Sequence, residues 1–386
     1  MKHNLIQLFF ILIGFIFFTQ LSAQSIVFAQ ETMTQTGIET FFEAKVIEVT
    51  KEEEITFEDQ SRQLYQELKL EVLTGDNTAQ EIMIENGKIP LASVVKYKTG
   101  DVVVVSEQTD TEGTPIYFIT DFVRRPVLLY LLILFIVLSI LIGKIWGLTS
   151  LIGMAYSFLV IVEFVLPQLL LGKDPVMIAI LGSIMIIPVT FYLSHGINKK
   201  TTISIGGTII ALIVTGVLAQ LFITTGHLTG LASDEAQYLK IFQGEHINMK
   251  GLLLAGIIIG ALGILDDITI SQASIVHQLK AANPKMSQTE LIQRGMAVGR
   301  DHISSLINTL ILVYTGAALP LLLLFIDNPQ PFSYIVNQEI VAEEIIRTLV
   351  GTIGIIIAVP ITTLLAVYIY NKTGVGSDSP SHTHAH

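Results

Sequence analysis

The sequence predicts an α-helical polytopic membrane protein, with about seven transmembrane helices after a signal sequence and a small extracytoplasmic β-domain before the first of them. Three observations predict this. First, 51% of the 386 residues are hydrophobic and only 14% are charged, whereas about a quarter of the residues of a soluble domain are charged. Second, the deficit falls in long, nearly uncharged stretches, as a bilayer requires. Third, an acidic segment with the pattern of β-strands precedes those stretches.

The N-terminus has the features of an export signal. Lys2 and His3 precede an apolar run at 5–18, and Val27-Phe28-Ala29 provides a small-residue cleavage pattern. We expect residues 1–29 to be a signal peptide or an uncleaved signal anchor, and the residues that follow to be exported. The chain has no cysteine, which excludes disulfides, thiolate metal sites and cysteine nucleophiles.

Residues 30–123 are expected to form the exported β-domain. Turn sequences separate five short segments in which apolar residues alternate or cluster: 41–49, 64–73, 81–85, 102–107 and 116–120. This spacing predicts a small barrel or sandwich, a fold that by itself indicates no function. Between Gln30 and Arg125 stand 19 acidic and 9 basic residues, a net charge of −10. Such a surface excludes nucleic acid as a partner, because phosphate binding requires clustered lysine and arginine.

Residues 124–370 are expected to form the transmembrane domain. Most of its apolar stretches have the ~17–25 residues that cross a bilayer: 126–142, 145–166, 175–194, 201–224, 251–265, 302–326 and 345–370. The fifth stretch is short and ends in Asp266 and Asp267. We interpret residues 371–386 as a polar tail, in which alternate histidines stand in a solvated segment.

The distribution of basic residues predicts the orientation, because lysine and arginine favour the cytoplasmic side. With the β-domain outside, eight basic residues near the helix ends fall on the cytoplasmic side: Lys144, Lys199, Lys200, Lys280, Lys285, Arg294, Arg300 and Lys372. Five fall on the outer side: Arg124, Arg125, Lys173, Lys240 and Lys250. Together with the export signal, this asymmetry predicts a cell-membrane protein with an external N-terminal domain and a cytoplasmic C-terminus.

The fifth stretch has small residues at helical spacing. Gly256, Gly260 and Gly263 follow one another at about one turn, a spacing that lets a second helix approach closely. We therefore expect these three glycines to pack against another helix.

Two polar stripes follow. At about 100° per residue, one arc of the continued helix carries Asp266, Asp267, Ser271, Ser274 and His277. A second stripe begins after the capping-box sequence at 287–290; its members are Arg294, Asp301, Ser305, Asn308 and Thr315, with Ser304 beside them. Asn283-Pro284 breaks the helix between the stripes and permits the chain to reverse. We therefore expect both stripes to converge on one site near the cytoplasmic side.

Two interpretations of these residues stay open. Charged and amide side chains at membrane depth line ion or proton paths, and paired carboxylates hold a proton or a cation. Alternatively, the residues lie at the inner membrane interface, where Asp266 and Asp267 end a helix.

Two long motifs contain most of these polar residues. The first is GALGILDD at 260–267, followed by QAS at 272–274; the second is GRDHISSLINTL at 299–310, followed by GAALP at 316–320. Both resemble the signature of the YibE/F-like family of bacterial multi-pass membrane proteins. The resemblance covers roughly 120–370 and implies the same architecture, a bacterial plasma membrane and a companion subunit similar to the membrane half. The candidate residues of an ion path are then Asp266, Asp267, Gln272, His277, Arg300, Asp301, His302, Ser305 and Asn308.

The leading hypothesis is a transporter or channel for a small solute or ion, without enzymatic activity or cofactor. The second hypothesis is a non-catalytic envelope component, in which the β-domain binds a ligand or partner protein and the helices anchor or signal. A third hypothesis is an intramembrane enzyme, which requires a nucleophile or a set of metal ligands. The candidate metal ligands are Asp266, Asp267, His277, Asp301 and His302. The sequence has no P-loop, HExxH, GxSxG or dinucleotide motif. The expected partners are the lipid bilayer and a companion subunit or a second copy.

Overall fold

The computed structural model describes residues 40–57, 60–75, 78–90, 93–109, 115–326 and 330–374. The expected signal segment 1–29 and the histidines of the tail lie outside these residues. The described chain divides into two compact units, with the boundary between Leu138 and Ser139. The first unit holds the β-domain and the start of the first long helix, and the second is a helical bundle.

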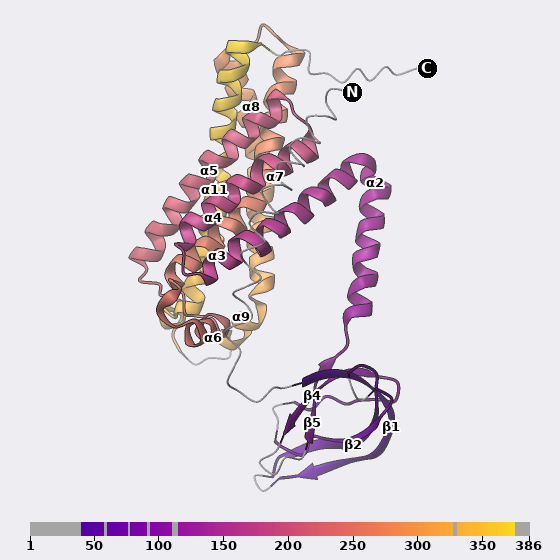
Figure 1. Ribbon diagram of the computed structural model, residues 1–386. Helices are drawn as coiled ribbons and strands as arrows, with labels where there is room; N and C mark the ends of the chain where they lie inside the picture. Colours follow the sequence, from indigo (N-terminus) through magenta and orange to yellow (C-terminus); the bar gives the residue numbers. More distant parts are fainter. Residues whose placement is uncertain are drawn as a thin grey trace. The chain divides into compact units, whose positions relative to one another are not determined.

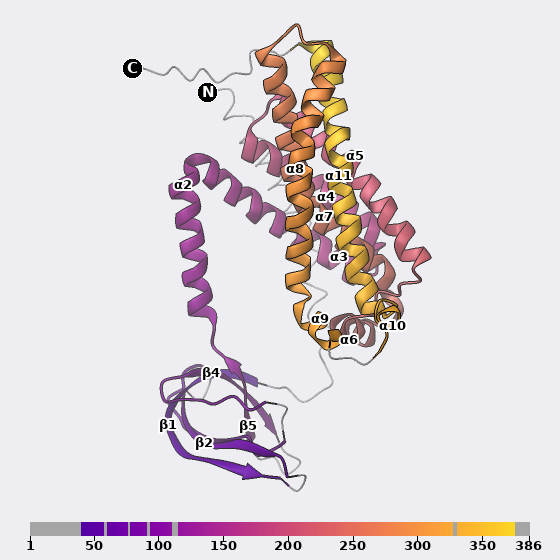
Figure 2. The same cartoon turned by 180° about the vertical axis from the view of Figure 1, so that it is seen from behind.

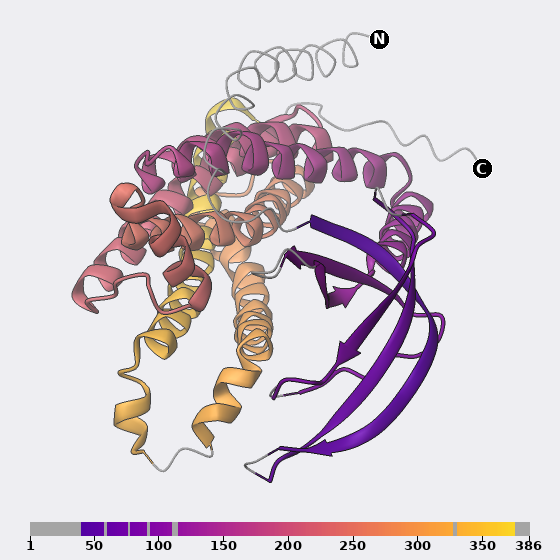
Figure 3. The same ribbon diagram turned by 60° about the horizontal axis from the view of Figure 1, so that its bottom comes forward.

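The β-domain is a single antiparallel sheet of five strands in the order β3-β2-β1-β4-β5. Its strands are β1 (Thr40–Thr56), β2 (Arg62–Val72), β3 (Glu81–Asn86), β4 (Val102–Thr109) and β5 (Pro115–Phe122). The register of β1 against β2 shifts twice, after Val46 and after Val49, and such bulges bend a strand. The sheet therefore curls (Figure 3), which brings the edge strands β3 and β5 into contact. This confirms a small β-domain in the form of a curled sheet.

Alternation along the strands produces the core of this domain. Residues such as Ala44, Val46, Leu68 and Leu70 are fully buried inside the curl, while their neighbours face outward. The side chain of Gln66 joins the segment 93–98 to the sheet: Nε2 donates to the carbonyl of Tyr97 over 3.0 Å, and Oε1 accepts from its backbone N–H over 2.9 Å.

In the same sheet, the hydroxyl of the buried Tyr65 lies between two glutamate side chains. Its hydroxyl donates to Glu85 over 2.9 Å and to Glu67 over 3.1 Å. Burial raises the pKa of Tyr65 above its ordinary value, and the two carboxylates raise it further. The phenol therefore stays protonated and keeps both hydrogen bonds.

The second unit consists almost entirely of helices. They are α2 (Arg125–Val160), whose first part belongs to the other unit, the π-turn η1 (Ile161–Val165), α3 (Leu166–Leu170), α4 (Pro175–His195), α5 (Lys199–Thr225), α6 (Asp234–Gln243), the 3₁₀ turn η2 (Gly244–His246), α7 (Met249–Ala282), α8 (Gln288–Ala317), α9 (Leu319–Ile326), α10 (Phe332–Ile335) and α11 (Glu339–Thr373). Figure 1 shows α4, α5, α7 and α11 running side by side, and α8 lies along α11 in Figure 2.

Five of these helices are long and apolar enough to cross a membrane, counting Arg125–Leu170 as one, and the bent pair α8 and α9 makes a sixth. The pair bends by 71°. Helix α2 contains a break at Lys144, whose φ of 51° and ψ of −131° are not helical. This break falls between the first two stretches expected from the sequence.

Pro188 lies inside α4 and Pro360 inside α11, whereas Pro320 is the second residue of the short helix α9 after the bend.

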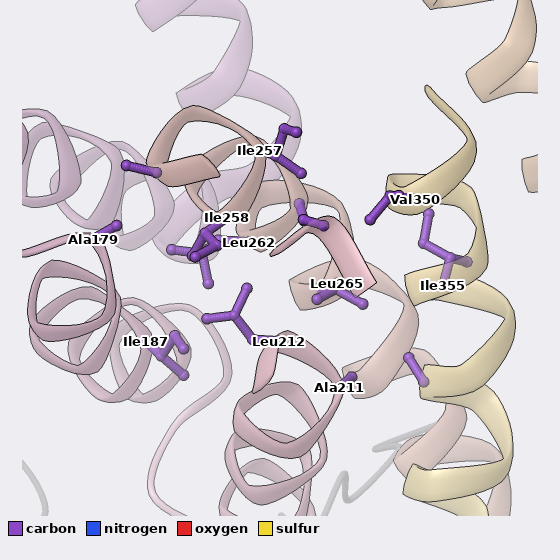
Figure 4. Close-up of a cluster of buried hydrophobic side chains, with 14 of the residues drawn as sticks. Ala179, Ile187, Ala211, Leu212, Ile257, Ile258, Leu262, Leu265, Val350 and Ile355 are labelled. Atoms are coloured by element: carbon purple, nitrogen blue, oxygen red, sulfur yellow. The ribbon is translucent and has the colours of Figure 1, made fainter. Parts of the chain in front are cut away.

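Helices α5, α7 and α11 form the centre of the bundle. Figure 4 shows Leu262 and Leu265 of α7 among side chains of α5 and α11, including Leu212 and Ile355, in the largest buried apolar cluster. Small residues allow this close contact. A Cβ atom on Gly207 of α5 would lie 2.5 Å from the hydroxyl of Thr362, which no side chain could tolerate unless the hydroxyl moved.

Candidate functional site

Helix α7 carries the first polar stripe without interruption. Asn248 caps its start by accepting from the backbone N–H of Gly251 over 3.0 Å, and the helix ends at Ala282, before Asn283-Pro284. Asp266 and Asp267 therefore lie near its middle. The alternative that Asp266 and Asp267 end a helix is wrong, whereas the expected continuation of the helix past them to His277 is confirmed. No helix breaker follows Gly263 before Asn283, so the helix continues through both acids.

A polar cleft opens beside the last three turns of α7. Its volume is about 840 Å³. Four helices and the turn between two of them contribute its lining: Gly143, Trp146, Gly147 and Ser150 from α2; Ser194 and His195 from α4; Asn198 from the turn; Lys200 from α5; and Ser274, His277 and Gln278 from α7. Hydroxyl, imidazole, amide and ammonium groups thus meet in this cleft.

A tight turn between α4 and α5 positions one wall of the cleft. Gly196 ends α4 with a φ of 75°, a conformation that favours glycine. Asn198 then caps α5, because its Oδ1 accepts from the backbone N–H of Thr201 over 2.9 Å. The Nδ2 of Asn198 donates to the carbonyl of His195 over 2.8 Å. This network fixes His195 and Lys200 on either side of a single turn.

The opposite wall comes from the predicted polar face of α7. Ser274, His277 and Gln278 line the cleft, and the His277 ring lies 5.3 Å from the ring of Tyr370 in α11. Seven residues earlier than Ser274, Asp267 is exposed on the same face. Asp267 is not among the residues that line the cleft, but it lies farther along the same face, near the middle of the helix.

Asp266 and Gln272 lie elsewhere on the helix. Asp266 is partly buried. Gln272 is fully buried, and its Nε2 donates to the carbonyl of Gly295 in α8 over 3.0 Å and to the hydroxyl of Thr363 in α11 over 2.7 Å. Its amide thus joins three helices and does not face the cleft.

The second stripe does not meet the first within one copy of the chain. Ser287 caps α8 as expected, by accepting from the backbone N–H of Glu290 over 3.2 Å. The buried side of α8, with Gly295 and Gly299, faces Gln272, Val276, Val359 and Thr363. The stripe lies on the other side of α8, where these residues are exposed: Arg294, Arg300, Asp301, Ser304, Ser305, Asn308 and Thr315. His302 is partly buried. Gly299 favours this orientation, because a Cβ there would lie 2.6 Å from Val359 of α11.

Residues 131–372 match the family described as YibE/F-like protein. The chain belongs to the YibE/F-like family. The matched residues include the described bundle almost in full and all the residues of the cleft, while the β-domain lies outside them. The chain matches no curated protein and no solved structure.

The glycines expected to pack against another helix are open in this YibE/F-like chain. Gly256, Gly260 and Gly263 lie on the face of α7 that carries Asp267, and no atom comes within 4 Å of a Cβ built on any of them. Their packing role therefore stays a prediction. The glycines in close contact are others, among them Gly207, Gly299 and Gly354.

Several residues of the YibE/F-like cleft were not expected from the sequence. They are Trp146, Ser150, Ser194, His195, Asn198 and Lys200. The glycine and asparagine at 196 and 198 do indicate a tight turn between two helices. Sequence periodicity, however, does not show that this turn faces α7. As for the metal alternative, the described residues contain no group of three His, Asp or Glu side chains that could hold a metal ion.

Proposed function

We propose that this YibE/F-like chain is a transporter or channel-like protein that passes a small polar solute or ion. The observation that carries the proposal is the polar cleft of about 840 Å³ at one end of an apolar bundle, with Asp267 farther along the same face of α7. Polar groups in a membrane-spanning bundle are costly unless water or a solute reaches them. A wetted cleft satisfies this requirement.

The cleft offers groups with different tasks. Lys200 and the imidazoles of His195 and His277 are the groups of its lining that carry or accept positive charge. They suit an entrance that attracts anionic or polar solutes. Asp267 provides a negative charge at greater depth, where a carboxylate binds a coupling cation or a proton. The chemistry of the lining supports binding and passage, so we propose a non-enzymatic function without a cofactor.

The proposed membrane arrangement has seven spans. The helical stretch from Arg125 to Leu170 has 46 residues, about 69 Å at 1.5 Å per residue, which is twice the ~30 Å of a hydrocarbon core. The break at Lys144 divides it into two pieces of suitable length. With the β-domain exported, the cleft then faces the cytoplasm of a bacterial cell. The excess of lysine and arginine at that end supports this orientation.

Ion and solute flux in proteoliposomes tests the proposal. The purified chain is reconstituted into vesicles, and gradients are imposed. Proton flux is recorded with a pH-sensitive dye, and the fluxes of sodium, potassium, chloride and phosphate are recorded separately. We expect one of these fluxes to exceed that of empty vesicles and to fall at least roughly tenfold with Asp267→Asn, as when a charge in a path is removed. Asp234→Asn, at the exposed start of α6, is the matched control and should leave the flux unchanged.

A flux equal to that of empty vesicles for every probe, or a flux that Asp267→Asn leaves intact, contradicts the proposal. The second hypothesis, an envelope component that binds a partner, then gains weight. One observation favours it: Phe41 and Phe118, 60% and 40% exposed, flank Ser106 on the outer face of the β-sheet. Exposed aromatic side chains of this kind occur at protein interfaces.

A further inference from the structure

The exposed side of α8 carries polar and charged residues in the middle of a membrane-length helix. Arg300, Asp301, Ser305 and Asn308 are all exposed there. Figure 2 shows α8 along the outside of the bundle, beside α11. Arg300, Asp301 and Asn308 make no hydrogen bond or ion pair through their side chains with any residue that the structure describes.

Packing against α11 shows the depth of these groups. A Cβ on Gly299 would lie 2.6 Å from Val359, so this level of α8 faces Val359. Val359 stands 12 residues after Arg347 and 13 before Lys372, about 18 to 20 Å from each along the helix. Arg300 and Asp301 are therefore far from both ends of the apolar part of α11, at a level where a bilayer contains hydrocarbon.

Lipid is an unfavourable neighbour for this side of α8. Arginine or aspartate at the centre of a spanning helix costs about 2.5 to 3.5 kcal/mol each on insertion scales. Such residues normally face protein or water. A protein surface that covers α8 must therefore supply donors and acceptors at the same depth.

Apart from Asp267, which is exposed near the middle of α7, and the cleft at one end of the bundle, the other segments supply few such groups. The first part of α2, 126–143, has only Tyr130 and Ser139 as polar residues, and the apolar run at 5–18 has only Gln7. The outer faces of α4 and α5 present residues such as Ile184, Ile213 and Val217. Complementary groups at this depth do occur on the exposed side of α8 itself, which has a cation, an anion and a self-pairing amide.

We propose that the exposed side of α8 is the interface between two copies of this chain, related by a twofold axis along the membrane normal. In such an interface like residues meet near the axis. The amide of Asn308 donates to and accepts from Asn308 of the second copy, as amides do between membrane helices. Arg300 of each copy pairs with Asp301 of the other. The proposal does not depend on transport, and it rests on the depth and exposure of α8 alone.

Disulfide trapping tests whether the α8 helices of two copies lie close together. The natural chain has no cysteine that would interfere. Ser305→Cys and Asn308→Cys are each reconstituted at a low protein-to-lipid ratio and oxidised. The control is Ile210→Cys on α5, which is 43% exposed and close to Thr208, whose hydroxyl bonds Thr269 of α7 in the interior of the bundle. Because a disulfide requires Cα atoms about 4.4 to 6.8 Å apart, we expect dimers with at least one α8 variant and only background with the control. Background in all three variants overturns the proposal.

A charge exchange tests the chemistry of the interface. Asp301→Arg and Arg300→Asp should each weaken self-association about tenfold, measured by single-molecule photobleaching in liposomes. The double variant should restore it. Adjacent residues of a helix do not face each other, so the rescue has to come from the second copy. A monomer in the natural sequence, or a dimer that neither single change weakens, overturns the proposal. So does a chain that is monomeric when pure and cross-links through α8 only to a different protein in native membranes.

Discussion

Gln272 joins three helices through one side chain. Its Nε2 serves two acceptors, the carbonyl of Gly295 and the hydroxyl of Thr363, and its burial is complete. Two neutral hydrogen bonds in an apolar surrounding stabilise the arrangement of α7, α8 and α11 directly. The role that the geometry favours for Gln272 is thus to position helices, and a path residue would need contact with the cleft.

We expect Gln272→Ala to lower stability by about 1 kcal/mol, which is typical of interhelical hydrogen bonds with a small cavity added. Thermal denaturation of the purified protein in detergent measures the loss. Gln278→Ala removes an exposed amide on the same helix and should leave the melting temperature unchanged. Equal melting temperatures for both variants would show that the buried amide does not hold the helices.

At the level of helices, glycine positions decide which faces meet. A Cβ on Gly299 would lie 2.6 Å from the side chain of Val359 and 3.0 Å from the side-chain Oε1 of Gln272, whereas a Cβ on Gly256 meets nothing within 4 Å. Helix α8 can approach α11 closely because Gly299 has no side chain. The same close approach turns the polar side of α8 outward.

We therefore expect Gly299→Ala to destabilise the protein by about 1 to 3 kcal/mol through overpacking. The matched change Gly256→Ala should be neutral or slightly stabilising in a single copy, because alanine is the better helix former. Melting of both variants in detergent gives the comparison. Val359→Ala provides the space that Gly299→Ala requires, so the double variant should regain part of the loss. If the double variant regains nothing, the destabilisation by Gly299→Ala does not come from the contact with Val359.

The sequence predicts elements better than it predicts which faces meet. Strand positions such as 81–85, the cap at Ser287 and the end of α7 at Asn283 follow from local rules, because turns and caps act within a few residues. Contacts between distant segments, such as His195 beside α7, depend on packing that periodicity does not encode. The expected meeting of two polar stripes failed for this reason.

For the molecule as a whole, chemical labelling should distinguish the two sides of the membrane. Gln80→Cys lies in the β-domain and Lys285→Cys in the turn between α7 and α8, and both positions are exposed. The positive-inside bias predicts that Lys285 faces the cytoplasm. A membrane-impermeant thiol reagent on intact cells should therefore label Gln80→Cys and not Lys285→Cys, while permeabilised cells should show both. The reverse pattern would invert the proposed orientation and place the cleft outside.

The lengths of the central helices have a further geometrical consequence. Helix α7 has 34 residues and α11 has 35, about 51 Å each, and an average tilt of about 20° reduces the span only to about 48 Å. A hydrocarbon layer of about 30 Å leaves well over 10 Å of each helix in the two headgroup layers or beyond them. Gln278 is four residues from the end of α7, so this excess length lifts the mouth of the cleft out of the acyl chains. Under the proposed transport function, a solute would enter among lipid headgroups and water, and would meet the acyl chains only beyond Ser274.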